Sequence, residues 1–98
     1  MTIEDFQSSL AGAEPSPSLS DALQALWWDA KGNWDKAHGL AQRHTSDPAS
    51  DWVHAYLHRK EGDLSNAMYW YRRAGRPGAG EPLAQEWLAI VGALLEGR

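Results

Sequence analysis

Apolar residues recur every three or four positions along most of the chain, which is the period of one face of an α-helix. Four such stripes occupy the centre of the sequence: Leu23, Leu26, Trp27 and Ala30; Trp34, Ala37, His38 and Ala41; Trp52 or Val53 with Tyr56, Leu57 and Lys60; and Leu64, Ala67, Met68 and Tyr71. A fifth comprises Leu83, Trp87, Ile90, Val91, Leu94 and Leu95. No segment alternates strictly between apolar and polar residues, as a half-buried strand would. We therefore predict an all-α fold.

Glycines and capping side chains separate the stripes. Gly32 suits the left-handed position that follows a helix, and Asn33 can cap the next helix. Gly62 and Asp63 repeat this arrangement. A helix stop followed at once by a helix start makes the two helices fold back on each other, so the sequence predicts two antiparallel helix pairs. The second pair begins at Asp47-Pro48, a capping side chain followed by a proline in the first helical position.

Shorter segments flank the two pairs. Thr2 can cap a short helix that stops at Ala11-Gly12, and the Pro/Ser-rich stretch after it cannot continue a helix. The residues of this helix that share an apolar face are Ile3, Phe6 and Leu10. Residues 75–80 predict a loop, and the last helix is expected to begin near Glu81-Pro82. We therefore divide the chain into residues 1–18, a short helix with a Pro/Ser linker, and residues 19–98, a helical domain with a C-terminal capping helix.

Residues 20–45 align with residues 50–75 as two copies of one pattern. The alignment pairs Ala25 with Ala55, Gly32 with Gly62, Asn33 with Asp63, Trp34 with Leu64 and Ala37 with Ala67. The end of the second copy, Ala67-Met68-Tyr69-Trp70-Tyr71-Arg72-Arg73-Ala74, fits the Ala-x-x-Trp-Tyr-x-x-Ala ending of the Sel-like repeat. Over about residues 19–76 the chain resembles the tetratricopeptide repeat, and its second copy is similar to the Sel-like variant.

The resemblance implies a groove that binds a peptide or a partner helix, because the first helix of each pair lines the concave face in tetratricopeptide domains. Carried over to this sequence, the lining would be Ala22, Leu26, Asp29, Trp52, Tyr56, Arg59 and Lys60. The residues predicted to bind the partner are Leu26, Asp29, Trp52, Tyr56, Arg59 and Lys60. Trp52 and Tyr56 would supply apolar anchors. Arg59 and Lys60 would meet an acidic peptide, or alternatively stabilise the C-terminal dipole of their own helix in solvent.

Two helix pairs cannot cover their own ends, so the flanking helices are the expected caps. We expect the last helix to close the second pair, and the N-terminal helix to lie on the first pair or in the groove.

The tryptophans help to predict which parts of the chain are buried and which could form an interface. The chain of 98 residues is 43% hydrophobic and contains six tryptophans and no cysteine, which suits one folded domain without disulfides. Trp27, Trp34 and Trp87 lie on apolar stripes and should be buried. The other three tryptophans are Trp28, Trp52 and Trp70. Any of them that is exposed would mark an interface.

Charge argues against nucleic acid as the main partner, and the lack of a long apolar run argues against a membrane span. The net charge is −4, although basic residues concentrate within residues 59–80. No apolar run approaches the roughly 18 residues needed to span a bilayer. The first residues, Met1–Phe6, are acidic where a secretory signal would be basic, so we expect a cytoplasmic protein.

Histidines are the only candidate metal ligands with a suggestive spacing. His54 and His58 stand four apart on one predicted helix, and His38 and His44 precede them. Ala55 occupies the position where a zincin motif requires glutamate. In the repeat register His54 and His58 pack between helices, so the favoured interpretation is structural histidines, with no metal and no cofactor. The carboxylates lie mostly near helix starts and turns, and no serine accompanies a predicted base, so no catalytic residue is predicted.

The sequence thus predicts a non-enzymatic protein–protein interaction module. The first alternative is a homodimeric structural or adaptor protein whose groove is filled by its own N-terminal helix. Such a dimer could pair through exposed tryptophan or through the small residues of the last helix, Ala89, Gly92 and Ala93. The second alternative is a histidine-dependent metal-binding protein.

Overall fold

The described part of the chain consists of helices joined by turns and loops. Within residues 1–97, which the computed structural model describes, there are six α-helices and one short 3-10 helix, and no strand. In chain order these are α1 (Ile3–Ser9), α2 (Asp21–Ala30), α3 (Trp34–Ala41), the 3-10 helix Gln42–His44, α4 (Pro48–Glu61), α5 (Leu64–Ala74) and α6 (Leu83–Leu95). The predicted all-α class is confirmed.

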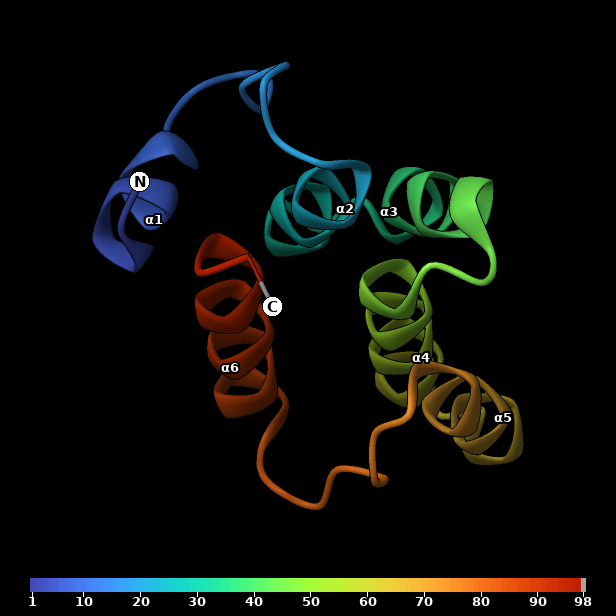
Figure 1. Cartoon of the computed structure of the whole chain (residues 1–98). Helices are drawn as coiled ribbons and strands as arrows, with labels where there is room; N and C mark the ends of the chain where they lie inside the picture. Colours follow the sequence, from blue (N-terminus) through green and yellow to red (C-terminus); the bar gives the residue numbers. More distant parts are fainter. Residues whose placement is uncertain (98) are drawn as a thin grey trace.

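The central helices form two stacked antiparallel pairs. Figure 1 shows α2 beside α3 and α4 beside α5, with the second pair packed on the first through contacts of α4 with α2 and α3. The last helix, α6, lies against α2 and α4 on the concave side of this array. The N-terminal helix, α1, packs on the outer side of α6.

Both turns within the pairs are built as the sequence predicts. Gly32 and Gly62 follow α2 and α4 with φ of 83° and 91°, a left-handed conformation that favours glycine. The side chain of Asn33 then accepts a hydrogen bond from the Lys36 N–H at 3.1 Å, and that of Asp63 accepts one from the Asn66 N–H at 3.3 Å. These contacts cap α3 and α5.

Two predicted helix ends differ in detail. α3 stops at Ala41, and the chain continues as the 3-10 helix Gln42–His44 before the predicted start of the second pair at Asp47-Pro48. Asp47 occupies the N-cap position of α4, but its side chain accepts from Ser50 Oγ at 3.2 Å and makes no capping bond to the helix backbone. The predicted cap of α1 is present, because Thr2 and Asp5 form a reciprocal capping box.

The core lies where α2, α4 and α6 meet, with α1 closing one side. The small residues that the repeat alignment pairs, Ala25, Ala37, Ala55 and Ala67, are buried and allow close packing within each helix pair. Phe6 of α1 is fully buried against Trp87 of α6, with ring centroids 5.7 Å apart. The predicted N-terminal segment therefore shares one core with the rest of the chain.

The helix that covers the concave face is α6. We expected the N-terminal helix on the first pair or in the groove, but α1 instead lies across α6 and touches only the end of α2. The small-residue face proposed for dimerisation is partly used by this packing, because a Cβ built at Gly92 would lie 3.2 Å from Ile3 Cδ1. Gly92, which is half-buried, therefore lies against the chain's own N-terminal helix.

The tryptophans are distributed nearly as predicted. Trp27 and Trp87 are buried, whereas Trp34 is only half-buried, so the prediction was wrong for Trp34. Its indole N–H donates to the Leu57 carbonyl at 2.9 Å. Trp52 is buried beneath the Arg76 guanidinium, 3.8 Å from the ring centroid. None of the six is fully exposed, and the three that are half-buried are Trp28, Trp34 and Trp70.

No described helix combines the length and the apolar character that crossing a bilayer requires.

The two turn glycines lead to a prediction with a matched control. Gly62→Ala should lower the free energy of unfolding by about 1–2 kcal/mol, because alanine is strained at positive φ. Gly39→Ala, inside α3 where an added Cβ meets no atom within 4 Å, should raise it by about 0.5–1 kcal/mol. Urea unfolding followed by circular dichroism measures both, and changes of the same sign would contradict the observed boundaries of α3 and α4.

Candidate functional site

The residues predicted to bind a partner do lie on one face, and α6 covers it. Leu26 and Asp29 come from α2, and the other four come from α4: Trp52, Tyr56, Arg59 and Lys60. Leu26, Asp29, Trp52 and Tyr56 are at most 9% exposed. The Trp87 indole N–H of α6 donates to the Leu26 carbonyl at 3.1 Å. The helix α6 thus occupies the place that the sequence pattern assigned to a partner helix. Binding of a partner by these residues stays a prediction.

Both predicted cations of the groove are paired with carboxylates of the same chain. Arg59 Nη1 lies 2.8 Å from Glu86 Oε1 of α6, and Arg59 also donates to the Glu81 carbonyl. Lys60 Nζ lies 2.8 Å from Asp29 Oδ1 of α2. Since Glu86 and Asp29 are both buried, these pairs hold α6 to α4 and α4 to α2.

Glu86 is a key residue that the sequence pattern did not identify. Its second carboxylate oxygen accepts from the Tyr71 hydroxyl at 2.5 Å, so one buried carboxylate joins α6 to both α4 and α5. Burial, followed by this contact with Glu86, raises the pKa of Tyr71, and the phenol therefore remains a donor at neutral pH. The sequence does contain a signal that could have identified Glu86: it is a single acidic residue on the apolar stripe that contains Leu83 and Ile90.

A pocket of about 390 Å³ remains open at one end of the covered face. It lies between α1, α2, α4 and α6, and three of the six predicted partner residues line it, namely Asp29, Tyr56 and Lys60. Its other lining residues are Gln7, Leu10, Ala30, Leu83, Ala84, Trp87 and Leu88. A larger hollow of about 500 Å³ lies beneath the linker around Pro15 and Pro17. That hollow contains none of the predicted residues.

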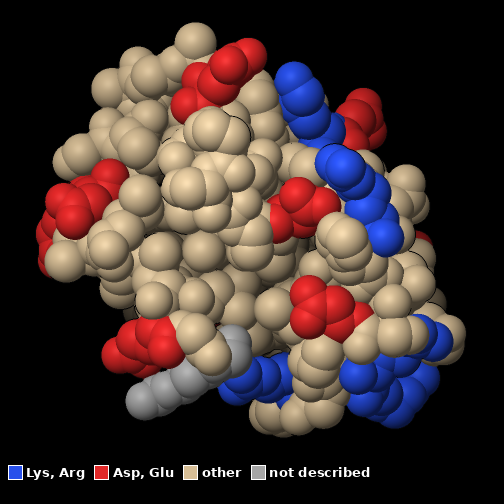
Figure 2. Space-filling model, turned by 45° about the horizontal axis from the view of Figure 1, so that its top comes forward, with Lys and Arg blue, Asp and Glu red and all other residues tan. Residues whose placement is uncertain are grey.

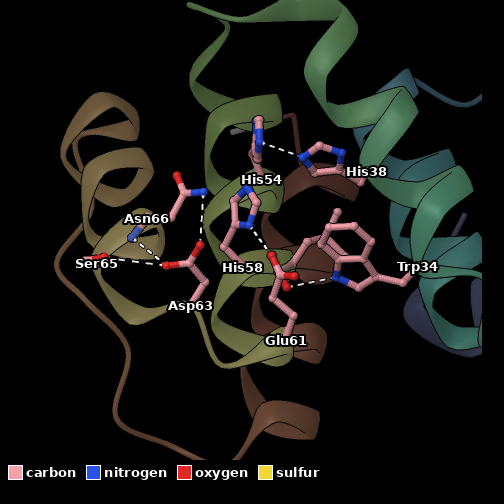
Figure 3. Close-up of polar contacts among 9 residues, drawn as sticks. Trp34, His38, His54, His58, Glu61, Asp63, Ser65 and Asn66 are labelled. Atoms are coloured by element: carbon pink, nitrogen blue, oxygen red, sulfur yellow. Dashed lines mark hydrogen bonds and ion pairs between the residues drawn. The ribbon is translucent and has the colours of Figure 1, made fainter.

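A second cluster of polar side chains lies between the two helix pairs. His38 of α3 and His54 and His58 of α4 turn their rings toward one another (Figure 3), with one nitrogen of each within 4.8 Å of the others. His38 Nε2 and His54 Nε2 are 3.1 Å apart. His44, also considered from the sequence, lies elsewhere and contacts Asp21 at 2.8 Å.

Aromatic rings and one carboxylate fix the orientation of these histidines. Trp34 stacks on His38 with centroids 4.8 Å apart, and Trp70 stacks on His54 at 3.9 Å. His58 Nδ1 lies 2.5 Å from Glu61 Oε2, which leaves His58 Nε2 for the interior of the cluster (Figure 3). We call His38, His54 and His58 the histidine cluster.

Burial keeps two members of the histidine cluster, His38 and His54, uncharged at neutral pH. Desolvation, reinforced by His38 and His58, lowers the pKa of His54 to about 4. Desolvation and the proximity of His58 also lower the pKa of His38. At neutral pH both rings are therefore neutral, and each presents a nitrogen lone pair.

No family model, curated protein or solved structure matches this chain. Its function must therefore be inferred from its own residues and their geometry.

The buried His54 leads to a pH-dependent stability. Its pKa in the folded chain is below the usual value of about 6.5, so the unfolded chain binds the extra proton first. The contribution of neutral His54 to the free energy of unfolding is complete above about pH 6.5. It is lost as the pH falls toward 4, and the total loss is up to about 3 kcal/mol. In urea unfolding experiments across this pH range, the free energy of unfolding should depend less on pH in His54→Phe than in the wild type. The control is His44→Gln, an exposed histidine, which should keep the wild-type slope; equal slopes in all three proteins would contradict the assignment.

Proposed function

We propose that the chain is a non-enzymatic protein–protein interaction module that binds one segment of a partner in the pocket between α1, α2, α4 and α6. The observation that carries the proposal is the pocket itself, which stays open at the end of a face that α6 otherwise covers. Pockets of this size, lined mainly by apolar groups with a few polar ones, are typical binding sites for a protruding side chain.

The lining indicates what kind of segment would bind. Leu10, Leu83 and Leu88 form an apolar wall, and Leu88 is still 37% exposed. Tyr56 and the Lys60–Asp29 pair contribute polar groups to the same pocket. A partner that presents an apolar side chain next to a carboxylate would bury the first against the leucines and place the second near Lys60. This arrangement supports an acidic peptide or helix as the partner.

A homodimer is the second candidate, and a different observation favours it. Leu64 and Met68 stand one turn apart on the outer face of α5 and are 63% and 42% exposed. Tyr69, at 45% exposed, lies next to them. Exposed apolar side chains grouped on one helix are a common feature of interfaces between identical chains.

Figure 2 is consistent with contacts through restricted areas of the surface. On the face it shows, Lys and Arg side chains gather along the right and lower edges, whereas Asp and Glu side chains are spread over the face and also lie near its middle. Uncharged surface lies between these acidic side chains, where an apolar part of a partner could bind.

Two exposed leucines allow a matched test of the proposal. Leu88→Glu places a charge in the pocket and should reduce capture of a partner from a host extract at least tenfold, because a buried unpaired carboxylate costs about 2 kcal/mol or more. Leu64→Glu makes the same change on α5 and should leave capture unchanged. Crosslinking followed by quantitative mass spectrometry of the captured proteins provides the measurement.

The same pair of variants separates the two candidates. Loss of capture in Leu64→Glu alone would contradict the pocket and place the contact on α5. A dimer in sedimentation experiments that dissociates in Leu64→Glu would favour the homodimer.

A further inference from the structure

Three imidazole groups converge between the two helix pairs without a structural need for all of them. His38 comes from the first pair, and His54 and His58 come from the second. Packing alone is served equally well by apolar side chains, which carry no polar atoms that must be satisfied inside a core. Neutral imidazole, in contrast, is the protein ligand that zinc, copper and nickel ions share.

The spacing of the rings is close to that of a metal centre. Zn–N bonds of about 2.0–2.1 Å in a tetrahedral arrangement place two ligand nitrogens about 3.3 Å apart. His38 Nε2 and His54 Nε2 are 3.1 Å apart, and one nitrogen of His58 lies within 4.8 Å of both. A small movement of His58 toward the other two rings would complete a three-nitrogen site. The half-buried His38 gives an ion access from the surface.

One nitrogen of the histidine cluster has no partner. Among the described residues, His54 Nδ1 is the one fully buried side-chain nitrogen or oxygen without a hydrogen bond. His54 is only 4% exposed, so solvent does not compensate it. Buried polar atoms are nearly always satisfied in folded proteins, so an exception needs an explanation, and a bound ion is one. His54 therefore has one nitrogen, Nε2, that faces His38 Nε2 at 3.1 Å, and a second, Nδ1, that is buried without a partner.

Glu61 supplies the outer contact that metal-binding histidines usually have. Its carboxylate lies 2.5 Å from His58 Nδ1, which leaves Nε2 as the ring nitrogen of His58 that does not contact Glu61. A carboxylate on the far nitrogen fixes the tautomer and the ring orientation and makes the ligating nitrogen more basic. Figure 3 shows Glu61 on the side of His58 away from His38 and His54.

We propose that His38, His54 and His58 bind a divalent first-row transition ion such as Zn²⁺, with Glu61 as the positioning residue behind His58. The ion joins α3 to α4 and so ties the two helix pairs together. The proposal is independent of the pocket next to α6. It differs from the interpretation of the sequence, which favoured histidines that only pack, because the sequence does not show that His38 meets the other two.

A neighbouring group of possible ligands is less suited to an ion. His58, Glu61 and Asp63 also lie close together, but the two carboxylates are exposed. Asp63 already caps α5 through the Asn66 N–H and contacts the Asn66 and Ser65 side chains (Figure 3). His58 is the residue common to both groups, and the three nitrogens form the more buried of the two sets.

Titration of the tag-free chain with Zn²⁺ near neutral pH tests the site directly. Calorimetry should give one equivalent per chain, and saturating Zn²⁺ should raise the melting temperature by about 5 °C or more, reversibly on addition of a chelator. Co²⁺ should give the intense visible absorption of a four-coordinate ion. His38→Gln should weaken Zn²⁺ binding at least about tenfold, and the control His44→Gln should leave it unchanged.

Glu61→Gln provides a second, independent readout. The Glu61 side chain is 40% exposed, so the variant should fold normally even if His38→Gln does not. It should bind one equivalent of Zn²⁺ with about tenfold lower affinity, because the contact behind His58 is weakened. The proposal is overturned if the wild type binds no Zn²⁺, if His38→Gln folds and binds it as tightly as the wild type, or if only His44→Gln loses binding.

Discussion

The rest of the fold depends on the packing of α6 against α2 and α4. Two stacked helix pairs present an apolar face that they cannot cover themselves, and α6 covers it with Trp87 and with the carboxylate of Glu86. Glu86 accepts from Arg59 and from the Tyr71 hydroxyl, so the buried charge is both neutralised and hydrogen-bonded. Phe6 then packs on Trp87, which brings the N-terminus into the same core.

The position of α4 at the centre explains how one short chain carries two candidate sites. Its residues from Ser50 to His58 are all buried, as expected of a helix surrounded by others. Tyr56 and Arg59 face α6, whereas His54 and His58 face α3 and Trp70 of α5. The pocket and the histidine cluster therefore lie on different sides of one rigid helix, and each can be altered without the other.

The features that the sequence predicted correctly, the helix ends and their caps, are set by interactions between residues close together in the chain. Gly32 and Gly62 end helices because of their own backbone conformations, and Asn33 and Asp63 cap residues only three positions away. The location of α6 depends instead on pairs such as Arg59–Glu86, which are 27 residues apart and produce no periodic signal. The histidine cluster is an intermediate case. The spacing of His54 and His58 predicts that they share a face, but the approach of a third histidine depends on how α3 packs against α4.

The position of α6 can be observed directly in solution by nuclear Overhauser spectroscopy. We expect cross-peaks from the Trp87 indole protons to the side chain of Leu26 and to the ring of Phe6, together with slow exchange of the Trp87 indole N–H. If those cross-peaks were absent and the amides of α6 exchanged as fast as those of an isolated helix, the concave face would be open, and α6 would not be the helix that holds the two pairs together.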